Sequence, residues 1–470
     1  MTPPSRLFDF LDYQLEHYPK SDMLSAKEGG VWKKRSTSEV KAQVDQLSSG
    51  LLRLGVGGHD FSLEGRDKVI LISKNRPEWI ITDLACQQVG AVLVPIYPTI
   101  NPLELEFILG EVGAKYVFLG DEPLFYQILE VRAKVPGILE IFTFDVVPGA
   151  RNYSELYGMA GPEDAEKIQS IKKSIRPDDL ATILYTSGTT GNPKGVMLSH
   201  HNIVSNVLES MKVLPVNDKD KALSFLPLNH IFERMITYVY INAGVSIYYA
   251  VSMDTIAENL REVQPEIFTT VPRLLEKVYE KIMATGLKLK GIKKRIFFWA
   301  ILVGKKYEVN RSFSLWYRLQ LKLVNKLVFS KWRAALGGHL KCIVTGSAAC
   351  QLRLLKMFTA GGIPILEGYG LTETSPVITV SHLNHPDWML GSVGVALGGI
   401  EIRIAEDGEI LTKGPNVMMG YYKQPDLTRE VMVDGWFHTG DIGELVDGRF
   451  LKITDRKKEL FKTSGGKYVA

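Results

Sequence analysis

The sequence has few cysteines and no long apolar run. Its three cysteines, Cys86, Cys342 and Cys350, lie far apart among 470 residues and match no metal-binding spacing. This usage excludes a disulfide-rich secreted domain and indicates a reducing compartment. No apolar run approaches the roughly 18 residues that a membrane-spanning helix needs, and the first residues lack the apolar core of a signal peptide. We therefore expect a cytoplasmic protein, either free or peripheral at the inner face of a membrane.

Charge is spread unevenly along an otherwise ordinary globular composition. The whole chain carries a net charge of +4, with 45% hydrophobic and 23% charged residues. Residues 286–341 contain 14 Lys and Arg but one acid, Glu308, which gives this segment +13 and the remainder −9. Apolar runs at 297–303 and 315–317 interleave with the basic residues. The segment is either an amphipathic element that contacts an anionic membrane or a packed helical hairpin with a solvated basic face. No recognition motif for nucleic acid accompanies the charge, so we expect no nucleic-acid partner.

Short apolar runs rich in β-branched residues alternate with helix-like segments. Asn101 and Pro102 form a typical helix start, with a capping side chain followed by proline at the first helical position. This alternation predicts an α/β fold with parallel sheets covered by helices. Beyond about residue 390, short alternating strands with glycine turns predict a small β-rich subdomain. The strands predicted before that point are residues 67–73, 91–97, 115–120, 180–185, 222–227, 245–250, 266–272 and 342–346.

Residues 186–195, Thr-Ser-Gly-Thr-Thr-Gly-Asn-Pro-Lys-Gly, follow one of these strands. Glycines allow backbone N–H groups to face an anion, hydroxyls donate further hydrogen bonds, and the lysine adds a positive charge. The run therefore predicts a polyphosphate site, whereas the simpler interpretation is a polar turn. It is not a Walker A loop, because Gly191 is not followed directly by Lys and Ser or Thr.

Three further motifs carry side chains suited to nucleotide chemistry. In residues 365–373, Tyr369 can stack on a purine, Thr372 can donate to a phosphate and Glu373 is a hard oxygen ligand for Mg²⁺. In residues 435–441, the carboxylate of Asp441 can accept hydrogen bonds from both hydroxyls of a ribose. His230 follows a predicted strand. Taken singly, these motifs have a simpler interpretation: a core tyrosine, a surface acid, a turn and a satisfied core histidine.

Together the motifs resemble those of the acyl-adenylate-forming superfamily, which includes acyl-CoA synthetases, luciferases and the adenylation domains of peptide synthetases. The resemblance implies a large N-terminal domain of two parallel-type α/β/α subdomains with a small β-rich subdomain. It also implies that ATP, Mg²⁺ and coenzyme A are bound. It assigns the nucleotide to Thr186, Ser187, Gly188, Thr189, Thr190, Gly191, Lys194, Gly346, Ser347, Ala348, Gly368, Tyr369, Asp441 and Arg456. It assigns catalysis to His230, Thr372 and Glu373, and the metal to Glu373.

The resemblance extends to the acid that is activated. Residues 269–279 and the insertion after them are similar to the gate region of long-chain fatty acyl-CoA synthetases, which implies acyl contacts from His230, Val271, Arg273 and Gly346. Amino-acid-activating relatives have an aspartate near position 230, so His230 favours a plain carboxylate. A long-chain fatty acid is therefore expected. A medium-chain or aryl acid–CoA ligase, a fatty acyl–AMP ligase and a non-catalytic binding module at a membrane remain alternatives.

The resemblance also divides the chain. Residues 1–454 correspond to the AMP- and acyl-binding domain, with the β-rich part roughly at 390–454, and residues 455–470 to the hinge, at Lys458, and the start of a C-terminal domain. In relatives, that second domain supplies a lysine for adenylation. We therefore expect these 470 residues to bind nucleotide but to turn over poorly.

Overall fold

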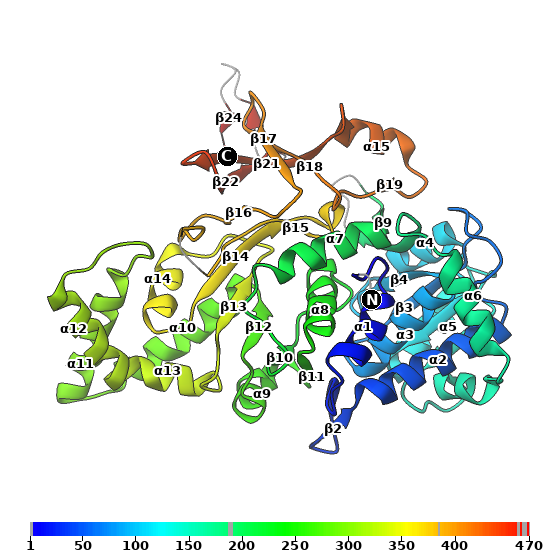
Figure 1. Ribbon diagram of the computed structural model, residues 1–470, viewed down its shortest axis with the longest axis horizontal. Helices are drawn as coiled ribbons and strands as arrows, with labels where there is room; N and C mark the ends of the chain where they lie inside the picture. Colours follow the sequence, from blue (N-terminus) through cyan, green and yellow to red (C-terminus); the bar gives the residue numbers. More distant parts are fainter. Residues whose placement is uncertain (1–2, 187–190, 384–385, 458–460, 463–467, 470) are drawn as a thin grey trace.

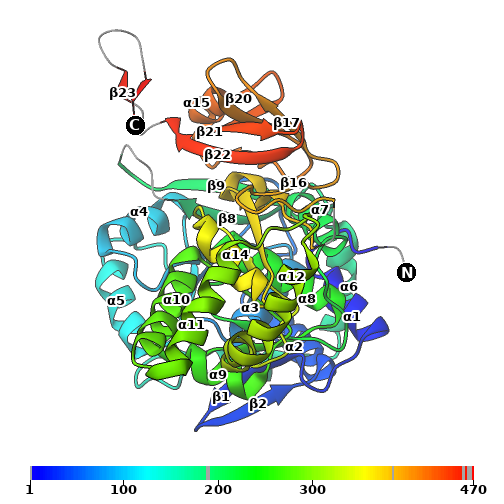
Figure 2. The same cartoon turned by 90° about the vertical axis from the view of Figure 1, so that its left-hand side faces the viewer.

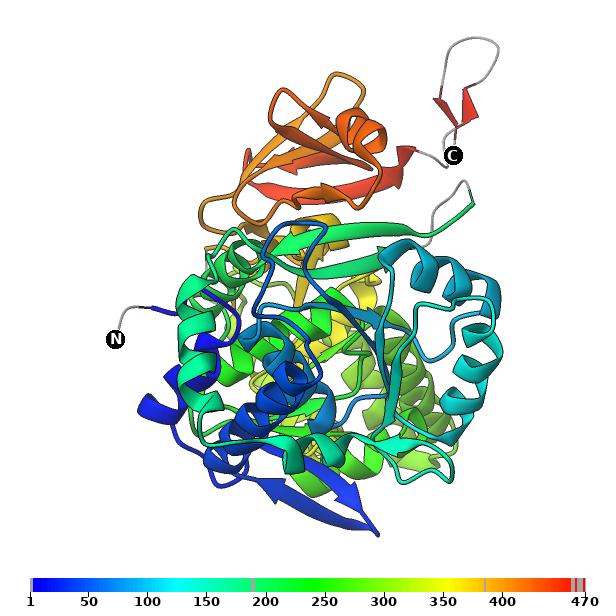
Figure 3. The ribbon, with the colours of Figure 1, turned by 90° about the vertical axis from the view of Figure 1, so that its right-hand side faces the viewer.

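Two large mixed sheets lie side by side and a small third sheet sits over one edge of them (Figure 1). The computed structural model describes residues 3–186, 191–383 and 386–457, together with the backbone of 461–462 and 468–469. Seen from the right-hand side of Figure 1, the small sheet lies above the green strands at the upper edge of the eight-stranded sheet (Figure 3). The predicted α/β class with a β-rich subdomain is confirmed.

The eight-stranded sheet contains the first three predicted strands in parallel. Strands β3 to β8 pair in parallel, whereas β9 and β19 extend the sheet antiparallel at one edge. The sheet is therefore mixed, because β9 pairs antiparallel with β8, whereas the sequence predicted parallel sheets. Its order is β19 (Gly420–Tyr421), β9 (Lys194–Ser199), β8 (Leu180–Thr186), β4 (Val92–Ile96), β3 (Lys68–Ile72), β5 (Tyr116–Leu119), β6 (Glu140–Thr143) and β7 (Arg151–Asn152).

The nine-stranded sheet has the same design of a parallel centre with antiparallel edges. Strand β1 and strands β10 to β14 are parallel, and β2, β15 and β16 pair antiparallel at the two ends. Its order is β16 (Val395–Ala396), β15 (Val377–Val380), β14 (Ile365–Gly370), β13 (Cys342–Thr345), β12 (Ile267–Thr270), β10 (Lys221–Ser224), β11 (Ser246–Tyr249), β1 (Leu24–Glu28) and β2 (Val31–Arg35).

Helices cover both large sheets. Helix α4 begins as the sequence predicts, because the Asn101 side chain accepts the backbone N–H of Glu104 at 2.9 Å and Pro102 opens the helix. The first half contains α1 (Asp9–His17), α2 (Thr37–Arg53), α3 (Pro77–Gln88), α4 (Pro102–Val112), α5 (Glu122–Arg132), η1 (Tyr153–Met159), α6 (Asp164–Ser174) and α7 (His200–Met211). The second half contains α8 (Ile231–Ala243), η2 (Met253–Thr255), α9 (Ile256–Val263), α10 (Pro272–Leu287), α11 (Gly291–Lys305), α12 (Leu315–Val324), η3 (Asn325–Phe329), α13 (Ser330–Ala335), α14 (Leu352–Ala360), η4 (Thr372–Thr374) and α15 (Pro425–Val431).

A buried ion pair joins the two halves. Arg234, on α8, donates to both carboxylate oxygens of Asp83, on α3, at 2.9 and 2.6 Å, and both side chains are fully buried. Tyr238 donates to the same carboxylate at 2.6 Å. Burial alone would lower the pKa of Arg234, but the Asp83 charge raises it, so the guanidinium stays charged. Such a pair is costly to break because the surviving charge would be left unpaired in the core.

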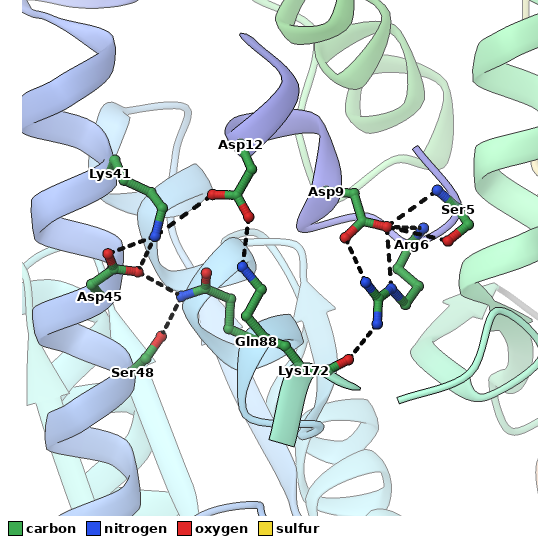
Figure 4. Close-up of polar contacts among 9 residues, drawn as sticks. All are labelled: Ser5, Arg6, Asp9, Asp12, Lys41, Asp45, Ser48, Gln88 and Lys172. Carbon is green, nitrogen blue, oxygen red and sulfur yellow. Dashed lines mark hydrogen bonds and ion pairs between the residues drawn. The ribbon is translucent and has the colours of Figure 1, made fainter. Parts of the chain in front are cut away.

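Helix α1 is held against the first subdomain by a second polar network (Figure 4). Lys172, on α6, donates to Asp12 at 2.6 Å, and Lys41, on α2, lies 3.6 Å from the other Asp12 oxygen. At the start of the helix, Arg6 pairs with Asp9 at 2.9 Å. The amino-terminal segment is thus tied to two other helices by charge.

The small sheet consists of β17 (Glu401–Ile404), β18 (Glu409–Lys413), β20 (Met432–Val433), β21 (Trp436–Val446) and β22 (Phe450–Arg456). A separate pair, β23 (Phe461–Lys462) and β24 (Tyr468–Val469), follows it. Within the described ranges, no helix combines the length and apolarity needed to cross a bilayer. The cysteines are unbridged, and each is buried in the core around the sheets.

Candidate active site

An apolar cavity lies beside the carboxyl ends of β13 and β14. This is the edge of a parallel sheet at which α/β proteins usually bind ligands. Helices α7 and α8 and strand β15 close its other sides. The cavity is lined by Ser210, Leu214, His230, Phe232, Ile236, Val344, Gly346, Ser347, Gly368, Tyr369, Gly370, Pro376, Val377 and Val380. Five predicted site residues therefore meet here: His230, Gly346, Ser347, Gly368 and Tyr369.

His230 occupies the N-terminal cap of α8. Its Nδ1 accepts the backbone N–H of Phe232 at 3.2 Å, which satisfies one helix-terminal donor. Burial lowers the pKa of His230, so the ring is neutral. Since Nδ1 is the acceptor, Nε2 carries the hydrogen. The cavity wall thus includes a neutral N–H donor of the kind that can bind a carboxylate oxygen.

Tyr369, Asp441 and Arg456 form one polar group. The Tyr369 hydroxyl donates to Asp441 at 2.7 Å, and the Arg456 Nε lies 3.5 Å from the other oxygen of that carboxylate. Burial and the nearby Asp441 charge raise the pKa of Tyr369, so the phenol remains a donor. Because Tyr369 also borders the cavity, this group connects the apolar pocket with the small sheet. The sequence motifs for adenine and ribose are therefore adjacent.

Glu373 lies on the short helix η4 and is bonded by a residue that the sequence analysis did not identify. Tyr421, on β19, donates its hydroxyl to Glu373 Oε1 at 2.8 Å, and the Lys194 ammonium lies 5.6 Å from the Tyr421 ring centre. Burial and the Glu373 charge raise the pKa of Tyr421, which keeps it protonated. Tyr421 therefore links the predicted metal ligand to the predicted phosphate lysine.

A backbone constraint shapes the same loop. A Cβ on Gly370 would lie 1.7 Å from the carbonyl oxygen of Pro376, so no other residue fits between Tyr369 and the η4 turn. Thr372 is the first residue of that turn and is partly buried beside Glu373. The close approach brings the two predicted catalytic residues next to Tyr369.

Glu409 is a second residue that the sequence analysis missed. It accepts the Gly440 N–H at 2.9 Å, the His438 ring at 3.0 Å and the Lys457 ammonium at 2.8 Å. Burial alone would raise the pKa of Glu409, but these hydrogen bonds and the Lys457 charge bring it below the usual range. Gly440 has φ +74°, a conformation that favours glycine. Glu409 therefore holds the turn that presents Asp441.

The two ends of the phosphate run belong to the antiparallel pair of β8 and β9. Thr186 ends β8 and is paired in register with Lys194, which begins β9. Gly191 has φ +132°, a conformation that favours glycine. The other predicted residues of this run, Ser187, Gly188, Thr189 and Thr190, lie outside the described residues, as does the hinge residue Lys458.

Three other predicted residues do not border the cavity. Val271 caps α10, and Arg273 is 69% exposed and pairs with Glu276 at 2.9 Å. Ala348 is exposed in the loop after β13. Their assigned contacts with acid or nucleotide remain predictions.

Comparison with known proteins identifies the family to which this arrangement belongs. Residues 11–422 match the family described as AMP-binding enzyme. The chain belongs to the AMP-binding enzyme family. It is 33% identical over 448 residues to long-chain-fatty-acid–CoA ligase FadD15 of Mycobacterium bovis, covering 94% of this chain and 72% of that protein. It is 35% identical to long-chain-fatty-acid–CoA ligase 6 of Mus musculus, over 93% of this chain and 64% of that protein.

Two solved structures share the fold. The Mycobacterium tuberculosis fatty acyl CoA synthetase aligns with a TM-score of 0.70 at 21% identity, covering 99% of this chain and 80% of that one. The N-terminal domain of FACL13 from the same organism aligns with a TM-score of 0.69 at 21% identity, covering 96% and 99%. The chain thus spans about two thirds to three quarters of the length of the curated ligases, and nearly all of a solved N-terminal domain.

Proposed function

We propose that this AMP-binding enzyme takes part in activating a long-chain fatty acid with ATP and coenzyme A. In the first step, a carboxylate oxygen of the acid bonds to the α-phosphorus of ATP, and the bond from that phosphorus to the β-phosphate bridging oxygen breaks. The products are acyl-AMP and pyrophosphate. In the second step, the thiol sulfur of coenzyme A attacks the acyl carbonyl carbon, AMP leaves, and the thiol proton passes to solvent.

The observation that carries the proposal is the junction at Tyr369, where an apolar cavity meets a polar group. An alkyl chain would enter the cavity with its carboxylate near the neutral N–H of His230. The ribose hydroxyls would donate hydrogen bonds to Asp441 in place of its partners in this structure. The adenine would lie against Tyr369. Catalysis in this arrangement is mainly positioning and charge stabilisation.

Glu373 fits a magnesium ion that arrives with the nucleotide. Magnesium in nucleotide sites is usually held by one or two carboxylates together with phosphate oxygens. Within the described ranges, no group of three or more His, Cys, Asp or Glu side chains is arranged for a metal. Bound there, the ion would neutralise phosphate charge, while Tyr421 orients the carboxylate and Lys194 faces the phosphates.

The test is acid-dependent release of pyrophosphate from Mg-ATP, with acyl-CoA identified by mass spectrometry. Palmitate, octanoate and benzoate are compared as acids, and AMP binding is measured separately by calorimetry. The proposal expects AMP to bind and palmitate to give the fastest release. AMP binding with release only from benzoate would contradict the fatty-acid assignment. Failure of AMP to bind would contradict the nucleotide site itself.

A further inference from the structure

One helix of the segment 286–341 exposes an apolar face. In α12, Leu315, Trp316, Leu319 and Leu323 are between 48% and 79% exposed. Their spacing of three and four residues places them on one side of the helix. A solvent-facing helix surface is normally polar, so this row is an unpartnered apolar stripe.

Helices α11 and α12 form a hairpin, and the opposite side of this hairpin packs against the rest of the fold. Phe297 and Ala300 of α11 are buried, and the Tyr317 hydroxyl of α12 donates to the Val303 carbonyl at 2.9 Å. A Cβ on Gly304 would lie 2.7 Å from the sulfur of Met357, on α14. The hairpin is therefore part of the fold, and the stripe is the side that the fold leaves uncovered.

Positive charge surrounds the stripe. Arg318 and Lys322 are exposed on the same helix, and Lys326 is exposed one turn further on. Of the 14 basic residues of this segment, Arg311 and Lys341 are the ones with an ion pair within the part of the chain that the structure describes. The single acid, Glu308, is already shared between Arg311 and Lys356. Most of the basic residues of this segment therefore have no ion pair within the described part of the chain.

The hairpin projects from the molecule. Helices α11 and α12 form the left-hand end in Figure 1, away from the small sheet, and they face the viewer with α10 in Figure 2. The two helices therefore lie at an end of the molecule that the small sheet does not cover.

We propose that the α11–α12 surface docks on a lipid bilayer that contains anionic headgroups. The apolar stripe enters the interface between headgroups and acyl chains, and the surrounding lysines and arginines contact the lipid phosphates. A row of aromatic and leucine side chains beside basic residues is the composition expected of an interfacial helix. The apolar row needs the acyl-chain boundary, and the basic residues need the anionic headgroups. Another protein surface would have to supply both an apolar groove and dense negative charge.

Vesicle co-sedimentation tests the proposal with the whole chain. The vesicles contain phosphatidylcholine alone or with about one third phosphatidylglycerol. We expect at least tenfold more binding to the anionic vesicles, falling as sodium chloride is raised because salt screens the attraction. Two variants, W316S/L319S and R318E/K322E/K326E, should each lower binding by about tenfold.

Matched controls separate this surface from general effects. The variant L103S/V146S removes two apolar side chains elsewhere that are more exposed than Trp316 and Leu319, and K173E/K219E/K413E reverses the same number of exposed charges. Both should bind anionic vesicles within about twofold of the original chain. Equal binding to both lipids, or equal losses in test and control variants, would overturn the proposal. So would absence of vesicle binding with a dimer in ultracentrifugation that W316S/L319S abolishes, because the stripe would then be an interface between copies.

Discussion

Two clusters of polar side chains, each centred on an aspartate, differ in how tightly they are enclosed. Asp83 accepts hydrogen bonds from two guanidinium nitrogens of Arg234 and from the hydroxyl of Tyr238, all in the core. Asp441 receives the Tyr369 hydroxyl at the border of a cavity, and Arg456 beside it is 67% exposed. The first arrangement is complete and serves stability, whereas a ligand can rearrange the second. Substitutions should therefore separate the two roles.

The largest effect is expected at the enclosed cluster. Arg234→Ala should lower the free energy of unfolding by about 3–5 kcal/mol, because the Asp83 carboxylate would be buried without a cation. Urea denaturation measures this loss. Arg429→Ala is the control, since Arg429 and Asp426 form an ion pair at the surface, where the loss should stay below about 1 kcal/mol. Similar losses in both variants would contradict a structural role for the enclosed pair.

Glu233 is a third buried acid. It extends the comparison of Asp83 with Asp441, because its hydrogen-bond partners are hydroxyls and not a cation. Ser224 donates to it at 2.6 Å and Thr269 donates to the other oxygen. Burial raises the pKa of Glu233 to about 7. The folded state therefore holds this proton more tightly than the unfolded chain, and stability should fall as pH rises from about 4.5 to about 7, by about 3 kcal/mol.

Glu233→Gln cannot ionise, so this part of the pH dependence should disappear. Unfolding in urea at pH 5 and pH 8 tests it, with each variant compared against the original chain. Glu367 serves as an internal reference, because burial also raises its pKa to about 7 and its own slope should persist in the variant. An unchanged pH profile would show that Glu233 ionises at its ordinary pKa in the folded protein.

At the open cluster, the expected loss is in binding. Asp441→Asn should weaken ATP or AMP binding by about 10- to 100-fold, which is the value of a charged hydrogen bond, while changing the free energy of unfolding little. Calorimetry and urea denaturation of the same samples give both quantities. Glu444→Gln removes an exposed acid from the same strand and should leave affinity unchanged. A large loss in the free energy of unfolding of Asp441→Asn would show that Asp441, like Asp83, has a structural role.

The smallest effect is expected at Tyr421, which orients Glu373. Tyr421→Phe removes one hydroxyl and should weaken Mg-dependent ATP binding by about three- to tenfold. Nucleotide affinity measured with and without Mg²⁺ isolates the contribution. The adjacent Tyr422→Phe also removes a hydroxyl, which donates to Glu64 at 3.0 Å, and it should have no such effect. Equal losses of Mg-dependent ATP affinity in the two variants would show that Tyr421 does not orient Glu373 for the metal.

Sequence reasoning succeeded where one stretch of chain contains the whole signal. The β13 strand and the capped start of α4 were predictable because hydrophobic runs and capping residues act over a few neighbours. The motifs also singled out Tyr369 and Asp441, which the structure brings into contact, and their contacts with a nucleotide remain predictions. The hydrogen bonds from Tyr421 to Glu373 and from Arg234 to Asp83 could not be predicted. The first joins residues 48 positions apart and the second joins residues 151 positions apart. No local pattern marks either partner.

The burial of all three native cysteines has a practical consequence. Burial raises the pKa of Cys86, and it raises the pKa of Cys342 and Cys350 to about 12. Thiol reagents attack thiolates, which these environments disfavour. A spin probe or fluorophore attached at an engineered Ser314→Cys, beside α12, would therefore report from that position against an almost silent background, with no need to remove the native thiols first.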